Sequence, residues 1–468
     1  MALLGGRGAD GLDLPPGGIA SPSATGIGQA VDVTNASDLL DDLQWRGLIA
    51  VSTDLEALRD ALDAAPVTYY CGFDPTAPSL HIGNLVQILT LRRLQLAGHR
   101  PLALVGGATG LIGDPKPTSE RTLNSSDTVA EWVGRVREQI EPYLSFEGDN
   151  AAVMVNNLDW TAPMSAIDLL RDIGKHFRVN KMIAKEAVSA RLSSDAGISY
   201  TEFSYQILQG MDFLELYRRH GCLLQTGGSD QWGNLTAGLD LIHRVEGRSA
   251  HAFATPLVTK ADGTKFGKTE AGTVWLDAGM TSPYAFYQFW VNADDRDVAA
   301  YLKVFSFRSR EKIEDLEKAA AERPAAREAQ RALADELTAL VHGQQQRDAV
   351  VAASQALFGR GDLADLDAAT LLSALAELPR AHAVRAAEGT WPTVVELLAE
   401  TGLSPSRSAA RRAVAEGGAY LNNLRVTTED ARPADADLLA GRWLVLRRGK
   451  RHLAAVDMTE PGSAPRPD

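Results

Sequence analysis

The sequence has little cysteine, no long apolar run and no excess of positive charge, and each shortage argues against a class of protein. Two cysteines among 468 residues, Cys71 and Cys222, cannot form a disulfide framework and are typical of the reducing cytoplasm. No apolar run approaches the roughly 18 residues of a transmembrane helix, so we expect no membrane association. The net charge of −13 argues against a chain that binds nucleic acid along its whole surface, although a local basic face remains possible.

The predicted strands and helices indicate an α/β fold with several domains. A chain of this length usually forms two to four domains. The predicted core alternates strands and helices, which is the pattern of β-α-β units and of a parallel sheet. The predicted elements are strands at 67–73, 101–106, 152–155 and 222–226, a helix at 84–97, and an almost wholly helical region at 284–343.

The junction between the first strand and its helix, YCGFDPTAPSLHIGN at 70–84, holds more polar and rigid residues than a turn needs. Ligands of parallel sheets bind beyond the carboxyl ends of the strands, and a helix N-terminus attracts phosphate. Gly72 and Gly83 allow a close backbone approach, and two prolines stiffen the turn. Thr76 and His81 supply hydrogen-bond donors. An ordinary capped turn would explain each residue alone, but the set indicates a nucleotide site.

Two segments come close to common phosphate-binding motifs, but neither has the required spacing. The segment GTKFGKT at 263–269 has three residues where a Walker A loop needs four. The segment GATGLIG at 107–113 follows a strand, yet it is not GxGxxG. The sequence therefore argues against a P-loop ATPase and against a dehydrogenase.

The segment ISYTEFSYQILQGMDFLELYRRHG predicts an apolar helix with one polar face. Ser199 and Glu202 predict a capping box at its start, and Gly221 predicts its end. The spacing alone leaves two readings equally open: the wall of a polar pocket, or a face exposed to solvent. The residues of the polar face, spaced i, i+4 and i+7, are Tyr205, Gln209 and Asp212.

Two short runs resemble the HIGH and KMSKS signatures of class I aminoacyl-tRNA synthetases: HIGN at 81–84 and KFGKT at 265–269. The ordered runs YCGFDPTAPSLHIGN, ALVGGATGLIGDP, YTEFSYQILQGMDF, GGSDQWGN and LVTKADGTKFGKT resemble more closely the bacterial tyrosyl-tRNA synthetases. Asn84 replaces the second histidine and keeps a donor without a charge, and Thr269 replaces serine and keeps the hydroxyl. The resemblance covers the chain except its N-terminal extension.

The resemblance implies a division of the chain into six parts. The implied fold class is α/β, with a Rossmann-like parallel-sheet domain followed by an α-helical domain and a small α+β C-terminal module. The expected parts are a disordered extension (1–34), a catalytic domain with a dimerisation insertion (35–260), the signature lysine loop with a helical anticodon-side domain (261–345), a helical linker (346–390), a ribosomal-protein S-four-like RNA-binding module (391–456) and a disordered tail (457–468).

The resemblance also implies an activity and the residues that perform it. The implied protein is a cytoplasmic homodimer in translation that activates L-tyrosine with ATP, Mg²⁺ being carried with the ATP, and then charges tRNA(Tyr). No residues are assigned to a resident metal. The residues expected in catalysis are Thr76, His81, Asn84, Lys265, Lys268 and Thr269. Those expected at tyrosine are Tyr70, Asp74, Asp114, Tyr205, Gln209, Asp212 and Gln231. Those expected at ATP are Cys71, Gly72, His81, Gly83, Gly228, Asp230 and Lys268.

Within these sets, each residue type suits its expected partner. By the resemblance, Asp212 and Tyr70 meet the phenolic hydroxyl of tyrosine, whereas Tyr205, Gln209 and Asp114 hold the α-amino group. Asp230 suits ribose hydroxyls. Lys265 and Lys268 suit the β- and γ-phosphates, where charge grows as pyrophosphate leaves. Without the resemblance, a capped loop and a solvated lysine pair would be the plainer readings of the last three residues.

The C-terminal segment carries a local basic surface. Between residues 391 and 451 ten Arg and Lys oppose seven Asp and Glu, so this segment is net positive within an acidic chain. Such charge follows a phosphate backbone. The residues expected at RNA are Lys116, Arg121, Arg407, Arg411, Arg412, Arg447 and Arg448.

Two rival functions remain open from the sequence. A tryptophanyl enzyme would share the nucleotide signatures, and an RNA-binding regulator could reuse an inactive synthetase fold. Asp212 and the C-terminal module favour tyrosine, whereas His81 and the two lysines favour an enzyme. Exchange of pyrophosphate into ATP, dependent on tyrosine, on tryptophan or on neither, separates the three.

Overall fold

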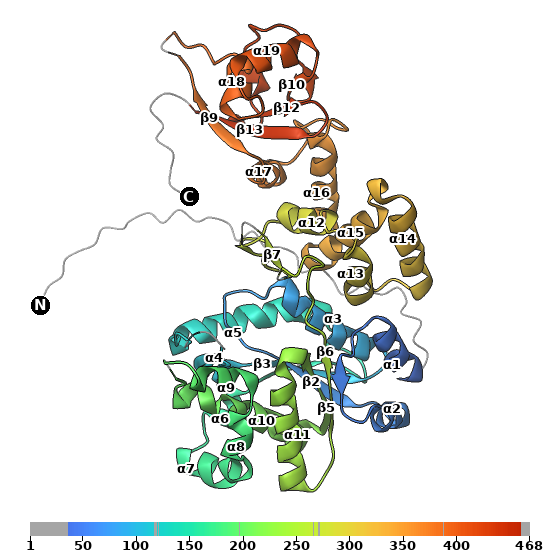
Figure 1. The fold of residues 1–468 in the computed structure, drawn as a ribbon. Helices are drawn as coiled ribbons and strands as arrows, with labels where there is room; N and C mark the ends of the chain where they lie inside the picture. Colours follow the sequence, from blue (N-terminus) through green and yellow to red (C-terminus); the bar gives the residue numbers. More distant parts are fainter. Residues whose placement is uncertain are drawn as a thin grey trace, which may run out of the picture.

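The computed structural model describes residues 36–116, 119, 121–195, 197–264, 266–269, 272–386 and 388–459. These residues form a sheet domain, a helical region and a C-terminal module in succession, coloured from blue and green through yellow to red in Figure 1. The expected extension at 1–34 lies outside the described residues. Of the expected tail, residues 457–459 are described, and they are the end of a strand rather than irregular chain.

The sheet domain contains six strands, and five of them are parallel. The first strand runs antiparallel to its neighbour, whereas the other neighbouring pairs are all parallel. This confirms the α/β class. In spatial order the strands are β1 (Val51–Ser52), β6 (His251–Thr255), β5 (Cys222–Gly228), β2 (Thr68–Phe73), β3 (Arg100–Val105) and β4 (Val153–Asn156).

Helices cover both faces of this sheet. Because successive residues of a strand point to opposite faces, β2 divides its side chains between two apolar cores. Tyr69 and Phe73 pack in the core that contains α1, α3 and α5, whereas Tyr70 packs in the core that contains α10 and α11. The helices of the domain are α1 (Ala36–Trp45), α2 (Leu55–Ala64), α3 (Ile82–Leu96), α4 (Gly107–Ile112), α5 (Ser126–Ile140), α6 (Leu158–Thr161), α7 (Ala166–Asp168), α8 (Val179–Ile183), α9 (Glu186–Leu192), α10 (Tyr200–His220) and α11 (Trp232–Glu246).

A helical region follows, which confirms the prediction for residues 284–343. Its interior is rich in aromatic side chains. Phe266, which precedes the region in sequence, lies among them with its ring centroid 5.1 Å from that of Tyr301 and 5.5 Å from that of Phe305. The helices are α12 (Pro283–Val291), α13 (Val298–Phe305), α14 (Arg310–Glu322), α15 (Glu328–His342), α16 (Gln344–Leu357) and α17 (Ala368–Ala376).

The C-terminal module is a five-stranded sheet with two helices. Helix α19 is followed by a turn at Gly417 and Gly418 and then by strand β10. Within the described residues no helix is long and apolar enough to cross a membrane. The elements are α18 (Val394–Glu400), α19 (Arg407–Ala415), and strands in the order β11 (Leu424–Arg425), β10 (Ala419–Leu421), β12 (Trp443–Arg448), β13 (His452–Thr459) and β9 (Arg380–Val384).

Strand β9 lies where the sequence predicts a helical linker. It pairs in parallel with β13, so the module begins before residue 391. The Ala- and Leu-rich composition of 346–390 favours helix, and α16 and α17 are indeed helices. At 380–384 the free backbone edge of β13 decides instead, since strand formation depends on pairing more than on local preference.

Candidate active site

Several polar residues lie beyond the carboxyl ends of the parallel strands. Asp74 follows β2, Asn157 follows β4, and Asp230 with Gln231 follows β5. Asp114 lies just after α4, the short helix that follows β3. The topology therefore brings together residues that are far apart in the sequence.

Asp74 links the end of β2 to helix α10. Its Oδ1 accepts a hydrogen bond from Thr109 Oγ1 at 2.6 Å, and its Oδ2 accepts one from the hydroxyl of Tyr205 at 2.7 Å. Gly106 is required beside this pair, because a Cβ there would lie 2.0 Å from Asp74 Oδ1. Burial raises the pKa of Asp74 to about 6 despite both hydrogen bonds. A cation that entered here would restore the charge of this carboxylate.

Asp212 is buried deeper in the same pocket. It is 1% exposed, and it accepts hydrogen bonds from Trp160 Nε1 at 2.9 Å and from Asn157 Nδ2 at 3.0 Å. Burial raises its pKa to about 7. Burial, with Asp212 as the next contribution, also raises the pKa of the neighbouring Tyr70, which therefore keeps its proton.

The hydroxyl of Tyr70 is a buried polar group that has no hydrogen-bond partner among the described residues. Leaving a buried hydroxyl unpaired costs free energy, so such a group indicates a missing ligand. The Tyr70 ring lies 5.2 Å from the Phe213 ring, which fixes its place. Tyr70 and Asp212 thus mark one end of the pocket as suited to a group that both donates and accepts hydrogen bonds.

The polar face of α10 points inward. Tyr205 is 5% exposed, and Gln209 Oε1 is buried with no hydrogen-bond partner within the described part of the chain. Together with the burial of Asp212, this excludes the solvent-exposed reading of the stripe. The stripe therefore faces the interior, as the wall of a polar pocket would, and its role in binding a substrate stays a prediction.

The ends of α10 agree with the prediction in part. Ser199 Oγ accepts a hydrogen bond from the Glu202 amide at 3.3 Å, and Gly221 ends the helix at φ +62°. The expected capping box is not formed. The Glu202 carboxylate instead accepts the Arg121 amide at 2.9 Å and pairs with the buried Arg191 at 3.0 Å, because tertiary partners outcompete the local one.

A second polar group surrounds Asp114. Its carboxylate accepts hydrogen bonds from Gln231 Nε2 at 3.2 Å and from Asn234 Nδ2 at 3.4 Å. The ammonium of Lys185 donates to Asn234 Oδ1. Burial raises the pKa of Asp114 and lowers that of Lys185 to about 8, and the attraction between the two opposes both shifts. This side of the pocket combines a carboxylate, two amides and a cation.

The start of helix α3 is closed by the residues of the first signature. His81 is the N-cap, and its Nδ1 accepts the amide of Gly83 at 3.1 Å. Asn84 Oδ1 accepts the amide of His81 at 3.1 Å, which completes a reciprocal cap. A neutral imidazole that accepts at Nδ1 carries its proton on Nε2, and Asn84 keeps its amide donors. A Cβ on Gly83 would lie 2.8 Å from His81 Cε1, so this orientation of the imidazole requires glycine at position 83.

The chain that follows the second signature lies beside the first. Ile82 donates its amide to Val274 O at 3.1 Å, and Leu276 donates its amide to Leu80 O at 2.8 Å. Val274 in turn donates to Gly267 O at 2.9 Å. Backbone hydrogen bonds therefore connect the two signature segments directly.

The signature lysine loop, defined here as residues 260–269, is described only in part. Lys265 lies outside the described residues. For Lys268 and Thr269 the backbone is described, as strand β7 (Lys268–Thr269), which pairs with β8 (Gly272–Thr273). The roles of these three side chains stay predictions.

The remaining residues expected at ATP differ in how they can contribute. Gly72 and Thr76 are exposed at the carboxyl end of β2. Gly228 is required beside Asp230, because a Cβ there would lie 2.5 Å from Asp230 Oδ1. The thiol of Cys71 is buried in the core, and burial raises its pKa to about 12. Only the backbone of Cys71 is therefore available to a ligand.

The residues expected at RNA fall into two groups. Lys116 is exposed, whereas Arg121 turns inward and donates from Nε to the Asp114 carbonyl at 2.9 Å. The others gather on α19 and β12 of the C-terminal module. There Arg412 is exposed, Arg407 pairs with Glu396 at 3.3 Å, Arg411 pairs with Glu429 at 3.6 Å, Arg447 lies 3.9 Å over the Tyr420 ring, and Arg448 donates to Leu403 O at 2.8 Å.

The pocket also contains residues that the sequence reading did not name. They hold the carboxylates in place or add charge beside them. The rule that strand ends line ligand sites could have found Asn157, which directly follows β4. The residues are Thr109, Asn157, Trp160, Lys185 and Asn234.

Comparison with known families agrees with this geometry. A profile described as "tRNA synthetases class I (W and Y)" matches residues 62–359, and one described as "Tyrosine--tRNA ligase SYY-like C-terminal domain" matches residues 373–456. The chain is 70% identical to the tyrosine–tRNA ligase of Streptomyces avermitilis over 90% of this chain and 99% of that protein. It is 65% identical to that of Leifsonia xyli over 90% and 94%.

Solved structures give the same result. A C-terminally truncated mitochondrial tyrosyl-tRNA synthetase from Coccidioides posadasii is 31% identical, with a TM-score of 0.59 over 67% of this chain and 90% of that one. The corresponding enzyme from Aspergillus nidulans is 29% identical, with a TM-score of 0.61 over 68% and 94%. The chain therefore belongs to the tyrosine–tRNA ligase family of the class I tRNA synthetases.

Proposed function

We propose that the chain attaches L-tyrosine to tRNA(Tyr) in two steps that share the pocket described above. In the first step a carboxylate oxygen of tyrosine attacks the α-phosphorus of ATP, the bond from that phosphorus to the α,β-bridging oxygen breaks, and tyrosyl-adenylate forms as pyrophosphate leaves. In the second step a hydroxyl of the terminal ribose of the tRNA attacks the tyrosyl carbonyl carbon, and AMP leaves. The enzyme needs no covalent nucleophile, because positioning and charge stabilisation supply the catalysis.

The observation that carries the choice of tyrosine is the pairing of Asp212 with the unpartnered Tyr70 hydroxyl. A substrate phenol between them would donate to the Asp212 carboxylate and accept from Tyr70. Phenylalanine would leave both groups buried and unpaired. A site that hydrogen-bonds a substrate hydroxyl rejects the analogue without it, a rule for which tyrosine-specific synthetases themselves are the reference example.

The α-ammonium group of tyrosine fits beside Tyr205, Gln209, Asp74 and Asp114. Two of these are carboxylates whose pKa burial raises, so an ammonium group would return them to the charged form. Gln231, hydrogen-bonded to Asp114, lies on the side where the substrate carboxylate would meet ATP. The lysine at 185 adds positive charge there, although sequence reasoning did not assign it.

The ATP phosphates fit the N-terminus of α3. The Nε2 proton of His81, the amide of Asn84 and the hydroxyl of Thr76 are suited to the α-phosphate as it becomes crowded in the transition state, and the helix end adds its partial positive charge. Asp230 suits the ribose, and Gly72, Gly83 and Gly228 permit close approach. We assign the β- and γ-phosphates to the side chains of Lys265, Lys268 and Thr269.

Mg²⁺ enters this proposal as part of the MgATP substrate. The described residues contain no group of three or more His, Cys, Asp or Glu side chains placed to hold a metal ion. In this family the phosphate oxygens would supply the ligands that Mg²⁺ prefers.

The C-terminal module is proposed to bind the tRNA. Its exposed arginines on α19 and the pair on β12 would follow the phosphate backbone. We also propose a homodimer in the cytoplasm; the two cysteines, both buried and unpaired, suit a reducing compartment.

Exchange of labelled pyrophosphate into ATP tests the proposal. The purified protein with MgATP should catalyse exchange only when tyrosine is added. Exchange that depends on tryptophan would contradict the assignment of the phenol end, and no exchange with any amino acid would contradict the enzymatic role of the site.

A further inference from the structure

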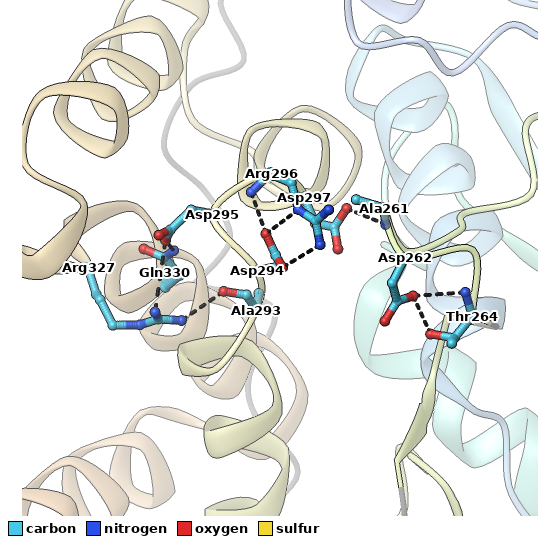
Figure 2. Close-up of polar contacts among 10 residues, drawn as sticks. All are labelled: Ala261, Asp262, Thr264, Ala293, Asp294, Asp295, Arg296, Asp297, Arg327 and Gln330. Carbon is cyan, nitrogen blue, oxygen red and sulfur yellow. Dashed lines mark hydrogen bonds and ion pairs between the residues drawn. The ribbon is translucent and has the colours of Figure 1, made fainter.

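Asp297 makes a contact that its position does not explain. It is the residue at which helix α13 begins, a place where aspartate commonly caps its own helix. Here the side chain forms no such cap. Its Oδ1 instead accepts a hydrogen bond from the amide of Ala261 at 2.8 Å, 36 residues away in the signature lysine loop (Figure 2). Asp297 is 8% exposed whereas Ala261 is exposed, so this is a partly buried, charge-assisted contact.

Ala261 belongs to a stiff turn, so fixing this one residue fixes the turn. Gly263 donates its amide to Lys260 O at 2.9 Å and has a φ of +77°. Asp262 Oδ1 accepts both the amide of Thr264 at 2.8 Å and its hydroxyl at 2.6 Å (Figure 2). These hydrogen bonds make the turn rigid, and Asp297 holds it at Ala261.

The segment that carries Asp297 is itself held by helix α15. Arg327 donates to the carbonyls of Val291 and Ala293, each at 2.8 Å, and Gln330 Nε2 donates to Asp295 Oδ1 at 2.5 Å. Figure 2 shows the contacts of Arg327 with Ala293 and of Gln330 with Asp295 on one side of the segment, and the contact with Ala261 on the other. A continuous set of polar contacts thus runs from α15 through residues 291–297 to the loop.

A second contact holds the loop on the far side of position 265. The Phe266 ring lies among the aromatic rings of α12 and α13, 6.0 Å from Trp290 and 5.5 Å from Phe305. The next residue, Gly267, lies against helix α3, because a Cβ there would be 3.0 Å from Ile82 Cγ1. The helical region therefore fixes the described loop residues both before and after position 265, next to the start of α3.

We propose that Asp297 is a positioning residue for tyrosine activation. Its carboxylate sets the place of the signature lysine loop on the helical region and so the distance between that loop and the N-terminus of α3. Asp297 does not touch the reacting atoms. This inference rests on the proposed role of the loop at the β- and γ-phosphates.

The test compares three substitutions in the full-length protein. Asp297→Ala removes the acceptor, and we expect the kcat of tyrosine-dependent pyrophosphate exchange to fall about tenfold while the KM for tyrosine changes less than twofold. Asp297→Asn keeps an Oδ1 acceptor and should recover most of the rate. Asp294→Ala is the matched control, because it removes an exposed carboxylate of the same segment that bonds to Arg296 within that segment, and it should leave exchange unchanged.

The outcomes separate positioning from stability and from the proposed function. A folded Asp297→Ala protein with unchanged exchange overturns the proposal, and so does an equal loss of rate and melting temperature in Asp297→Ala and Asp294→Ala. An Asp297→Asn protein as slow as Asp297→Ala overturns it as well. Lys268→Ala is measured alongside: if it slows exchange but Asp297→Ala does not, the role of the loop stands and the role of Asp297 fails. If Lys268→Ala also has no effect, the proposed function of the loop fails.

Discussion

The two ends of the proposed active site, one assigned to tyrosine and one to the nucleotide, are built in opposite ways. At the tyrosine end, polar side chains are buried and bonded to one another, as Asp212 is to Trp160 and Asn157. At the nucleotide end, the polar groups are a helix start, glycine backbones and a loop, and His81 Nδ1 and Asn84 Oδ1 each accept a hydrogen bond from a backbone amide. One end is a preformed pocket, and the other is a surface of backbone donors.

This difference follows from what each end must recognise. A phenol is neutral and small, so discrimination against phenylalanine needs buried groups that suffer when unpaired. A triphosphate carries large charge, so backbone amides and lysines suffice, and they can act in the presence of water. Substitutions at the tyrosine end should therefore change specificity, whereas those at the nucleotide end should change rate.

The largest expected effect is at Asp212. Asp212→Ala should lower kcat/KM for tyrosine about a thousandfold, roughly 4 kcal/mol, because it removes a buried charged hydrogen-bond partner of the substrate. The preference for tyrosine over phenylalanine should fall with it. Pyrophosphate exchange with each amino acid measures both. Glu215→Ala, one turn along α10 and paired with Arg219 at the surface, is the control. Undiminished selectivity in Asp212→Ala would show that the pocket is misassigned.

A substitution at His81 tests the other end. His81→Ala should slow adenylate formation about a hundredfold while the tyrosine Kd stays nearly unchanged, since the imidazole is assigned to the α-phosphate. His81 is also the N-cap of α3, so the loss of the cap must be separated from the loss of chemistry. His81→Asn keeps a good cap and should be as slow as His81→Ala but more stable by about 1 kcal/mol. An active His81→Asn protein would remove His81 from the catalytic residues.

The pH dependence of tyrosine binding should be smaller and should report on the buried end alone. With a pKa of about 6, Asp74 is protonated at low pH and must ionise to meet the substrate ammonium. Asp212, with a pKa of about 7, must also be ionised to accept the substrate phenol. The tyrosine Kd should therefore be constant above about pH 8, rise as the pH falls below about 7, and rise more steeply below about 6, by up to tenfold per pH unit for each carboxylate. Titration calorimetry between pH 5 and pH 8 measures this. Tyr205→Phe removes a hydrogen bond that lowers the pKa of Asp74, so the inflection should move to higher pH.

The smallest expected effect is in the C-terminal module, remote from both ends. Arg412→Ala should raise the KM for tRNA about threefold and reduce the salt dependence by about one phosphate contact, with pyrophosphate exchange unchanged. Arg442→Ala, whose guanidinium is bound to Asp457 at 2.6 Å, is the control and should not affect the tRNA. An unchanged KM in Arg412→Ala would place the RNA surface elsewhere.

Periodicity and turn residues predicted the elements whose structure is determined by their own local sequence. The strands β2, β3 and β5 and the helices α3 and α10 lie where the sequence predicts them. Strand β9 was missed because its only reason to be a strand is the edge of β13, more than seventy residues later in sequence, and pairing with a distant edge leaves no local pattern. The capping box at Glu202 failed for the same reason, since Arg191 and Arg121 reach it only in the folded chain.

The residues of the candidate site likewise divide into those that the sequence identifies and those whose role depends on the folded structure. The resemblance named Tyr205, Gln209 and Asp212, and the i, i+4, i+7 spacing placed them on one face, but spacing could not say whether that face is buried. Thr109 could not be named, because its importance lies in holding Asp74. Asn157, which holds Asp212, could have been found only from its place at the end of a strand. A supporting residue has no signature of its own, as its role depends on which partner the fold brings to it.

The central strand β2 has a consequence for how the protein is made. Its partner β3 emerges from the ribosome soon after it, but Thr226, which contacts Tyr70 O, comes 156 positions later, and the amide of Asp277, which contacts Ser79 Oγ, comes 198 positions later. The edge of β2 that pairs with β5 therefore stays unpaired until the roughly 150 residues between the two strands have been synthesised. Such distant pairing slows folding and exposes a strand edge to other chains. Nascent fragments that end before β5 should therefore be the forms of this protein most prone to aggregate.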